Sequence, residues 1–121
     1  MGATLTRDDT RTTAALWAAI QNGADGVTVD SLGNELPRYG YYVGGQSWTL
    51  VRAAHAVTPD DVAGYVSTHS GTRYFGMWVD GGRVYLDAVD LIYREGEAHE
   101  TARERRELAI FNIRSGESEA S

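Results

Sequence analysis

The stretch RYFGMWVDGGRVYLDAVDLIY, residues 73–93, decides the fold that this sequence predicts. Two runs of alternating apolar residues flank the segment Asp80-Gly81-Gly82. Glycine accepts the positive φ values that tight hairpin turns require, so the stretch predicts an antiparallel hairpin over residues 73–92. One face of this hairpin is uniformly apolar and should belong to the core; it carries Phe75, Met77, Val79, Val84, Leu86 and Ala88.

A second glycine pair, Gly44-Gly45, lies in the stretch RYGYYVGGQSWTL, residues 38–50. A phosphate-binding glycine loop stands between a strand and a helix whose N-terminal amides face the anion. Here runs rich in aromatic and β-branched residues, typical of strands, flank the pair on both sides. We therefore predict a second hairpin, over residues 38–54, with the glycine pair in its turn.

Helical patterns occur in three segments: residues 7–22, 58–68 and 95–107. The first places Leu16 and Ile20 on one face of a helix. The second begins with Thr58-Pro59, a capping residue followed by proline at the first helical position. The third is strongly charged, so we expect an exposed helix with ion pairs along its surface.

The C-terminal part adds a short strand at residues 108–113 and an acidic tail, residues 115–121, that we expect to be frayed. These elements predict one domain over residues 1–121. Because consecutive hairpins build antiparallel sheets, we expect an α+β fold. Its mainly antiparallel sheet should have about five strands built from two hairpins, with the helices packed on one face.

The charge balance argues against one class of partner. The net charge is -6, and all 11 basic residues are arginines. Nucleic-acid binding draws most of its affinity from phosphate contacts and needs a basic face, so we do not expect a nucleic-acid partner. An acidic protein suits a basic surface on a protein partner instead, while a homo-oligomer stays open.

Redox, metal and nucleophilic chemistry have no support in the sequence. Cysteine is absent, which excludes disulfides and thiolate ligands. His55, His69 and His99 lie far apart without metal-ligand spacing, and no serine stands in a nucleophile motif. We therefore expect no cofactor, no metal and no catalytic residue, and the sequence favours a protein that is not an enzyme.

The N-terminus turns polar at once, and no apolar run is long enough to span a bilayer. We therefore expect no membrane association and a cytoplasmic location.

Aromatic residues are dense in the two predicted hairpins. They can belong to the core, form a surface for a protein partner or line a ligand pocket. The set consists of Tyr41, Trp48, Tyr74, Trp78 and Tyr85.

Asp87 lies within a strand among apolar neighbours. A carboxylate in such a position can have a raised pKa and anchor a ligand. The alternative is a structural aspartate that binds a neighbouring amide or pairs with an arginine such as Arg73. We treat Asp87 and the aromatic set as candidate binding residues.

The segments YGYYVGG, WVDGGRVYLDAV and RERRELAIFNI resemble small uncharacterised proteins of actinobacteria and their bacteriophages. The resemblance covers roughly the C-terminal two thirds of the chain and does not include the N-terminal helix. It implies no activity and no site residues. It does favour a phage accessory protein, which would act in the host cytoplasm.

Two functions follow as hypotheses. The first is a small acidic protein-binding module without enzymatic activity, for example a phage accessory protein that inhibits a host factor. The alternative is a protein or enzyme that holds a nucleotide-like or sugar-like ligand on the aromatic hairpin face, with Asp87 as anchor.

Overall fold

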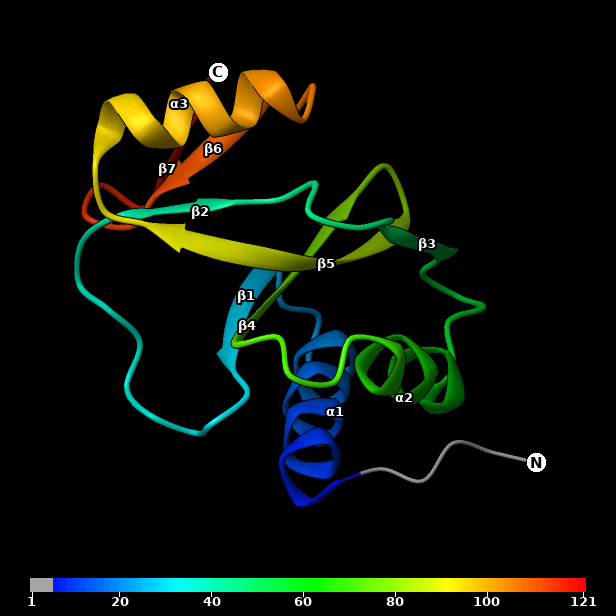
Figure 1. The fold of residues 1–121 in the computed structure, drawn as a ribbon. Helices are drawn as coiled ribbons and strands as arrows, with labels where there is room; N and C mark the ends of the chain where they lie inside the picture. The colour runs from blue at the N-terminus through cyan, green and yellow to red at the C-terminus, as the bar shows by residue number, and fades with distance from the viewer. Residues whose placement is uncertain (1–5) are drawn as a thin grey trace.

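The structure is a computed structural model that describes residues 6–121 (Figure 1). Its helices are α1 (Arg7–Gln21), α2 (Pro59–Thr68) and α3 (Glu95–Glu104). Its strands are β1 (Gly26–Asp30), β2 (Tyr41–Val43), β3 (Leu50–Ala53), β4 (Tyr74–Asp80), β5 (Arg83–Ile92), β6 (Ala109–Asn112) and β7 (Glu117–Ala120).

The predicted α+β class is confirmed. All strand pairs in the described part of the chain are antiparallel, and they form a sheet of seven strands rather than about five. The strand order is β1-β4-β5-β2-β6-β7, and β3 also pairs with β5. The ten residues of β5 therefore form the centre of the sheet, with β4 on one edge and both β3 and β2 on the other.

The hairpin predicted over residues 73–92 is confirmed. β4 pairs with β5 from Tyr74↔Val89 to Asp80↔Arg83, so the turn contains only Gly81 and Gly82. Their φ values are +57° and +75°, the region that a side chain with a Cβ rarely adopts. Glycine at both positions is thus the reason that the chain can reverse here in two residues.

The hairpin predicted over residues 38–54 is wrong. β2 and β3 do not pair with each other, since each pairs with a different part of β5. Gly44-Gly45 opens a six-residue loop, residues 44–49, that passes the middle of β5 instead of reversing tightly. The long strand β5 has free edge positions, and both short strands pair with it rather than with each other. Turn residues in the sequence do not show this competition.

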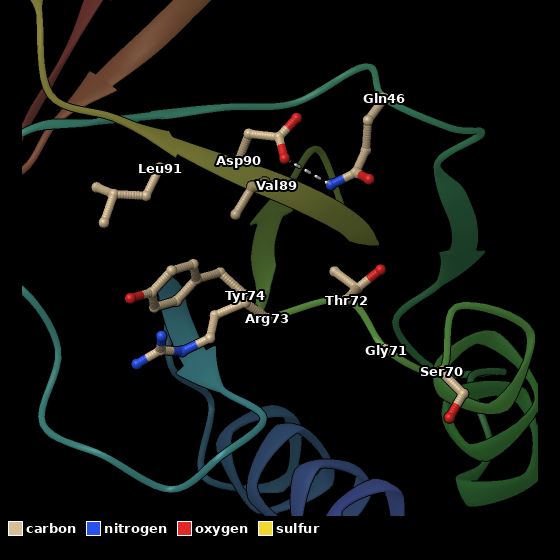
Figure 2. A pocket seen from close by; sticks show the side chains of 9 residues that line it. All are labelled: Gln46, Ser70, Gly71, Thr72, Arg73, Tyr74, Val89, Asp90 and Leu91. Carbon is tan, nitrogen blue, oxygen red and sulfur yellow. Dashed lines mark hydrogen bonds between the residues drawn. The ribbon is translucent and has the colours of Figure 1, made fainter.

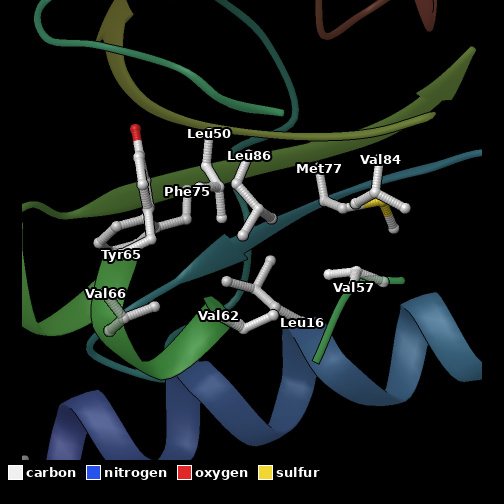
Figure 3. Packing of buried hydrophobic residues seen from close by; sticks show 10 residues of the cluster. All are labelled: Leu16, Leu50, Val57, Val62, Tyr65, Val66, Phe75, Met77, Val84 and Leu86. Carbon is white, nitrogen blue, oxygen red and sulfur yellow. The ribbon is translucent and has the colours of Figure 1, made fainter. Parts of the chain in front are cut away.

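The main core lies between the sheet and helices α1 and α2 (Figure 3). Side chains from the helices, among them Leu16 and Val62, pack against the apolar face of the confirmed hairpin, where Phe75 and Leu86 are almost fully buried. Because side chains alternate between the two faces of a strand, Ile92 lies on the same face of β5 as Leu86. It packs against a second, smaller apolar cluster next to α3. The side chains of β5 that face α1 and α2 and those that face α3 thus have the same parity along the strand, while Figure 1 shows α3 far from α1 and α2, beyond β5 and β2.

Helix α2 begins with the predicted cap. The Thr58 hydroxyl accepts from the Asp61 amide at 3.1 Å, and the Asp61 carboxylate accepts from the Thr58 amide at 3.0 Å. This reciprocal pair satisfies two amide groups that the first turn of a helix leaves free.

Helix α3 ends at Glu104, three residues before the predicted end. Arg106 takes a φ of +59°, and the Glu107 amide donates to the Ala102 carbonyl at 2.8 Å. This left-handed turn closes the helix and redirects the chain into β6. The helix is also less exposed than predicted, because its own residues Ala98 and Ala102 are fully buried. Arg105, just after the helix, pairs with Asp90 of β5.

The prediction of a frayed tail is wrong. Residues Glu117–Ala120 form β7, which pairs with β6 along four residues. None of the helices within residues 6–121 is long and apolar enough to cross a membrane.

Candidate functional site

A groove of about 1000 Å³ lies on the side of the sheet that the helices leave uncovered. We call it the sheet groove. It runs from the Trp78 end of β4, across the middle of β5, to Tyr42 of β2 and Phe111 of β6. Its rim collects large apolar residues that remain partly exposed, namely Leu36, Trp78, Leu108 and Phe111.

Glycine opens the middle of this groove. Gly76 lies opposite Asp87 in the β4–β5 register, on the uncovered face of the sheet. A glycine inside a strand contributes no side chain to fill the space above it. A Cβ at Gly76 would meet only Val89, at an ordinary contact distance of 3.5 Å, so the position is open rather than crowded.

Asp87 is the charged residue most deeply placed in the groove. Its residue surface is 2 % exposed, and its Oδ1 atom has no hydrogen-bond partner among the described residues. Burial, the larger cause, and the nearby negative charge of Glu107 together raise the pKa of Asp87 to about 7. Hydrogen bonds from the Gly45 amide and the Thr49 hydroxyl lower the pKa of Asp87, but they offset only part of this rise.

Glu107 reaches Asp87 across Gly44. A Cβ at Gly44 would collide with the carboxylates of both residues, so the two groups come close only because this position is glycine. Gly44 is thus required for a close approach and not for a tight turn. Glu107 is positioned by the left-handed Arg106 that ends α3, a conformation that strains a residue with a side chain.

The arginine nearest to this pair of carboxylates is engaged elsewhere. Arg105 binds the Asp90 carboxylate at 2.8 Å and donates to the Gly44 carbonyl at 3.1 Å. It does not line the groove. Arg73, the partner that the sequence offered for Asp87, instead binds both carboxylate oxygens of Asp30 at 3.0 Å.

The tyrosine at the other end of the groove also lacks a partner. Four buried side-chain atoms among residues 6–121 make no hydrogen bond, and two of them, Asp87 Oδ1 and the Tyr42 hydroxyl, belong to residues that line the groove. Burial raises the pKa of Tyr42 to about 12, so its hydroxyl stays protonated at neutral pH. Buried polar groups are normally paired, and two exceptions in one groove therefore indicate a place for a ligand.

Trp78 and Tyr85, two members of the predicted aromatic set, lie on the groove side of the sheet. Their rings stack with centroids 5.2 Å apart and planes within 2° of parallel. Trp78 lines the groove and is 38 % exposed. Tyr74 lies on the same side of the sheet but is buried against Tyr42, with ring centroids 5.6 Å apart.

The other two aromatic residues of the set lie away from the groove. Tyr41 alternates with Tyr42 and points toward α3, where its ring approaches His99. Trp48 packs edge-on against Tyr65 of α2, with ring centroids 4.7 Å apart. The predicted aromatic face is therefore split, because the hairpin that would have joined its halves does not form.

The sequence did not single out Tyr42, Gly76 or Glu107. A glycine within a strongly alternating strand is a detectable signal for an opening of this kind, and Gly76 provides it. Glu107 has no such signal, because only the packing of α3 and β6 beside β2 brings it to Asp87.

A second hollow, the edge pocket of about 540 Å³, lies at the start of β4 (Figure 2). It is lined by Gln46, residues 70–74 and residues 89–91. Its charged groups are already paired, since Arg73 binds Asp30 and Asp90 binds Arg105. The side chain of Gln46 also contacts Asp90, at 3.5 Å. These pairs make the edge pocket a weaker candidate than the sheet groove.

Three side chains that could ligate a metal ion come together on the opposite side of the sheet. His99 Nε2 lies 3.9 Å from Glu95 Oε1 and 3.3 Å from Glu119 Oε1. Glu119 belongs to β7, so the histidine spacing in the sequence could not predict this group. Exposed Glu95 and half-buried His99 and Glu119 also form ordinary ion pairs when the imidazole is protonated.

Comparison of the chain with protein-family models, with curated proteins and with solved structures found no match.

Proposed function

We propose that this protein binds a small, largely apolar ligand in the sheet groove, with Asp87 as its polar anchor. The observation that carries the proposal is the buried Asp87 carboxyl group, which faces a groove of about 1000 Å³ and has one oxygen without a hydrogen-bond partner in the described part of the chain. Ligand sites commonly combine such a cavity, an apolar lining and a few convergent polar groups with perturbed pKa values.

Folding alone does not account for Asp87. A carboxylate that is buried without an opposite charge beside it, and with one oxygen lacking a hydrogen bond within residues 6–121, disfavours the folded state. The strand would keep its pattern with an apolar or an amide side chain at this position. A carboxyl group that opposes stability is expected where it serves binding or chemistry.

The residues that line the groove argue against the two ligand types that the sequence suggested, a nucleotide-like and a sugar-like ligand. None of the described residues that line it is an arginine, and the sequence contains no lysine. Phosphate groups are recognised by such cations or by helix N-termini, so the groove does not suit a nucleotide-like ligand. Apolar walls and few hydrogen-bonding groups suit a compact ring or hydrocarbon body better than a sugar.

A fragment screen by ligand-observed NMR, run in parallel on wild-type protein and on Gly76→Val, tests the proposal. Valine at this position fills the floor of the groove and favours the strand. Gly64→Ala, which adds a side chain to an open glycine of α2, is the matched control. Fragments should bind wild type and Gly64→Ala and should be lost from a folded Gly76→Val. Fragments that bind all three proteins alike, or no fragments at all, would contradict the proposal.

The second candidate is the protein-binding module that the sequence suggested, as a phage accessory protein or host-factor inhibitor in the cytoplasm. One observation favours it: Leu108, on the rim of the groove, is 90 % exposed. Exposed apolar residues around a hollow are typical of surfaces that receive an apolar side chain from a partner.

Affinity capture from host lysate with wild type and with Leu108→Ser tests this candidate. A partner that is captured by wild type and lost with the variant would support it. Identical capture by both proteins would contradict it.

A further inference from the structure

We propose that the ligand of the sheet groove carries a cationic amino group, which binds beside the Asp87 and Glu107 carboxylates while its apolar body lies toward Trp78. This inference rests on the proposed small-ligand function of the groove and names the chemical class of that ligand. It comes from three features of the groove: the sign of its charges, the grouping of its carboxylates and the place of its aromatic rings.

Among residues 6–121, the charged residues that line the groove are all acidic, namely Asp25, Asp87 and Glu107. The guanidinium of Arg105 is already held by Asp90 and by the Gly44 carbonyl. An anionic ligand would meet uncompensated negative charge in a partly buried space, where electrostatic interactions are stronger than in water. A cationic ligand would relieve the repulsion between the carboxylates.

The two carboxylates that converge on Gly44 fit an ammonium group. A Cβ at Gly44 would lie 2.6 Å from Glu107 Oε1 and closer still to Asp87 Oδ2, so the two acidic groups serve the same small region. An ammonium group has three donors in a compact volume. It can therefore satisfy both carboxylates at once, including the Asp87 carboxyl whose Oδ1 atom has no partner within residues 6–121.

Strand geometry sets the length of the ligand. Gly76 pairs with Asp87 and Trp78 pairs with Tyr85, so the indole lies two residues along the strands from the anchor. Two residues of a strand span about 7 Å. A ring joined to the amine by a two-carbon chain covers this distance and stacks against Trp78, whose partly exposed face is also attractive to a cation.

Binding of an amine should be linked to ionisation of Asp87. The groups that face this carboxyl are Glu107 from the segment after α3 and the donors of Gly45 and Thr49, with the Tyr65 hydroxyl near the adjacent Ala88 amide. Since burial and Glu107 keep much of Asp87 protonated up to about pH 7, a bound cation should drive the proton off. Amine affinity should therefore rise between about pH 6 and about pH 8.

Isothermal titration of the full chain with three probes of matched shape tests the inference: 2-phenylethylamine, 2-phenylethanol and 3-phenylpropionate. The amine should bind roughly tenfold tighter than the alcohol, and the carboxylate should bind weakest. Titration in buffers of different ionisation enthalpy should show release of about one proton per amine at about pH 6, and far less at about pH 8.

Two variants distinguish a failure of the proposed amine class from a failure of the proposed binding function of the groove. Asp87→Asn should remove the preference for the amine and the proton release, while the alcohol still binds. Gly76→Val should abolish binding of all probes. Equal binding of amine and alcohol, both lost in Gly76→Val, would overturn the amine class and leave the groove function standing. Binding of none of the probes would overturn the amine class, and the fragment screen then decides the groove function separately.

Discussion

Asp30 and Asp87 are both buried aspartates on the uncovered side of the sheet, 5 % and 2 % exposed, yet their surroundings differ. Asp30, at the end of β1, receives two hydrogen bonds from Arg73 and one from the Leu32 amide at 2.9 Å. Burial alone would raise the pKa of Asp30, but these bonds and the Arg73 charge lower it overall. Asp87 has no such cation, and its pKa is raised to about 7.

The difference separates a structural carboxylate from a candidate functional one. The carboxylate of Asp30 is compensated within the protein, so its ionisation supports the fold. Asp87 is left uncompensated beside a groove and next to a second acid. The fold could have provided an arginine to Asp87 as it does to Asp30, and the absence of one among the groove residues agrees with a site kept free for a ligand.

The largest effect should come from Asp87→Asn, which removes the ionisable group and keeps its shape. The raised pKa means that Asp87 costs no stability below about pH 4 and costs progressively more as the pH rises to about 7. The variant should therefore match wild type at about pH 4 and be more stable by up to about 4 kcal/mol above pH 7. Urea unfolding across this pH range measures it, and a constant difference at all pH values would contradict the assignment.

Asp30→Asn should change the stability of the fold in the opposite direction to Asp87→Asn, and by a smaller amount. Its lowered pKa means that Asp30 stabilises the fold above the ordinary pKa of 3.8 and loses this contribution as the pH falls below it. Loss of hydrogen bonds to a charged group predicts destabilisation by about 2 kcal/mol at neutral pH, shrinking in acid. The same urea series reads out this result. If Asp30→Asn were as stable as wild type at neutral pH, the contrast between the two aspartates would fail.

Glu107→Gln removes a negative charge near Asp87 and should change the pKa of Asp87 through this loss of charge alone. Burial is the larger cause of the raised Asp87 pKa and Glu107 the second, so the variant should lower that pKa by less than burial raises it. The variant should therefore be more stable than wild type above pH 7, by less than the gain expected for Asp87→Asn. Combination with Asp87→Asn provides the control, because the gain should disappear when Asp87 no longer ionises. A gain that persists in the double variant would point to a different origin.

The smallest effect should come from Arg106→Gly at the end of α3. Arg106 adopts a φ of +59°, which glycine adopts without strain, although glycine also loses more entropy on folding. A net gain of about 0.5 kcal/mol is expected, measured by thermal unfolding. A clear loss of stability would indicate that the Arg106 side chain makes a contribution that outweighs the strain.

Local signals predicted much of the fold. The turn signal Asp80-Gly81-Gly82 and the alternation beside it predicted the β4–β5 hairpin, and Thr58-Pro59 predicted the start of α2. The sequence left two turns possible, and the structure places Gly81-Gly82 in the turn. The other strands depend on which strand edges are free: β2 and β3 pair with β5, β1 with β4, β6 with β2 and β7 with β6. That competition is a property of the whole sheet, and it explains why the hairpin over residues 38–54 and the frayed tail were wrong predictions.

The candidate site, like the fold, combines residues that local sequence signals predicted with residues that only nonlocal strand pairing brings together. Asp87 stands out in the sequence as a carboxylate among strand residues, and Trp78 and Tyr85 follow from the confirmed hairpin. Glu107 and Tyr42 reach the groove only through the pairing of β2 with β5 and β6. Residues brought together by nonlocal pairing have no shared spacing in the sequence, so no periodic pattern could have revealed them.

The most direct test of the account is a carbon-13 NMR titration of the side-chain carboxyl carbons, from about pH 3 to about pH 9, in wild type and in Asp87→Asn. The account predicts one aspartate carboxyl that titrates near pH 7, absent from the spectrum of the variant, while the Asp30 carboxyl titrates below its ordinary range. If the carboxyl of Asp87 instead titrated near 4 in the folded protein, it would be an ordinary solvated aspartate, and the proposed anchor of the sheet groove would be contradicted.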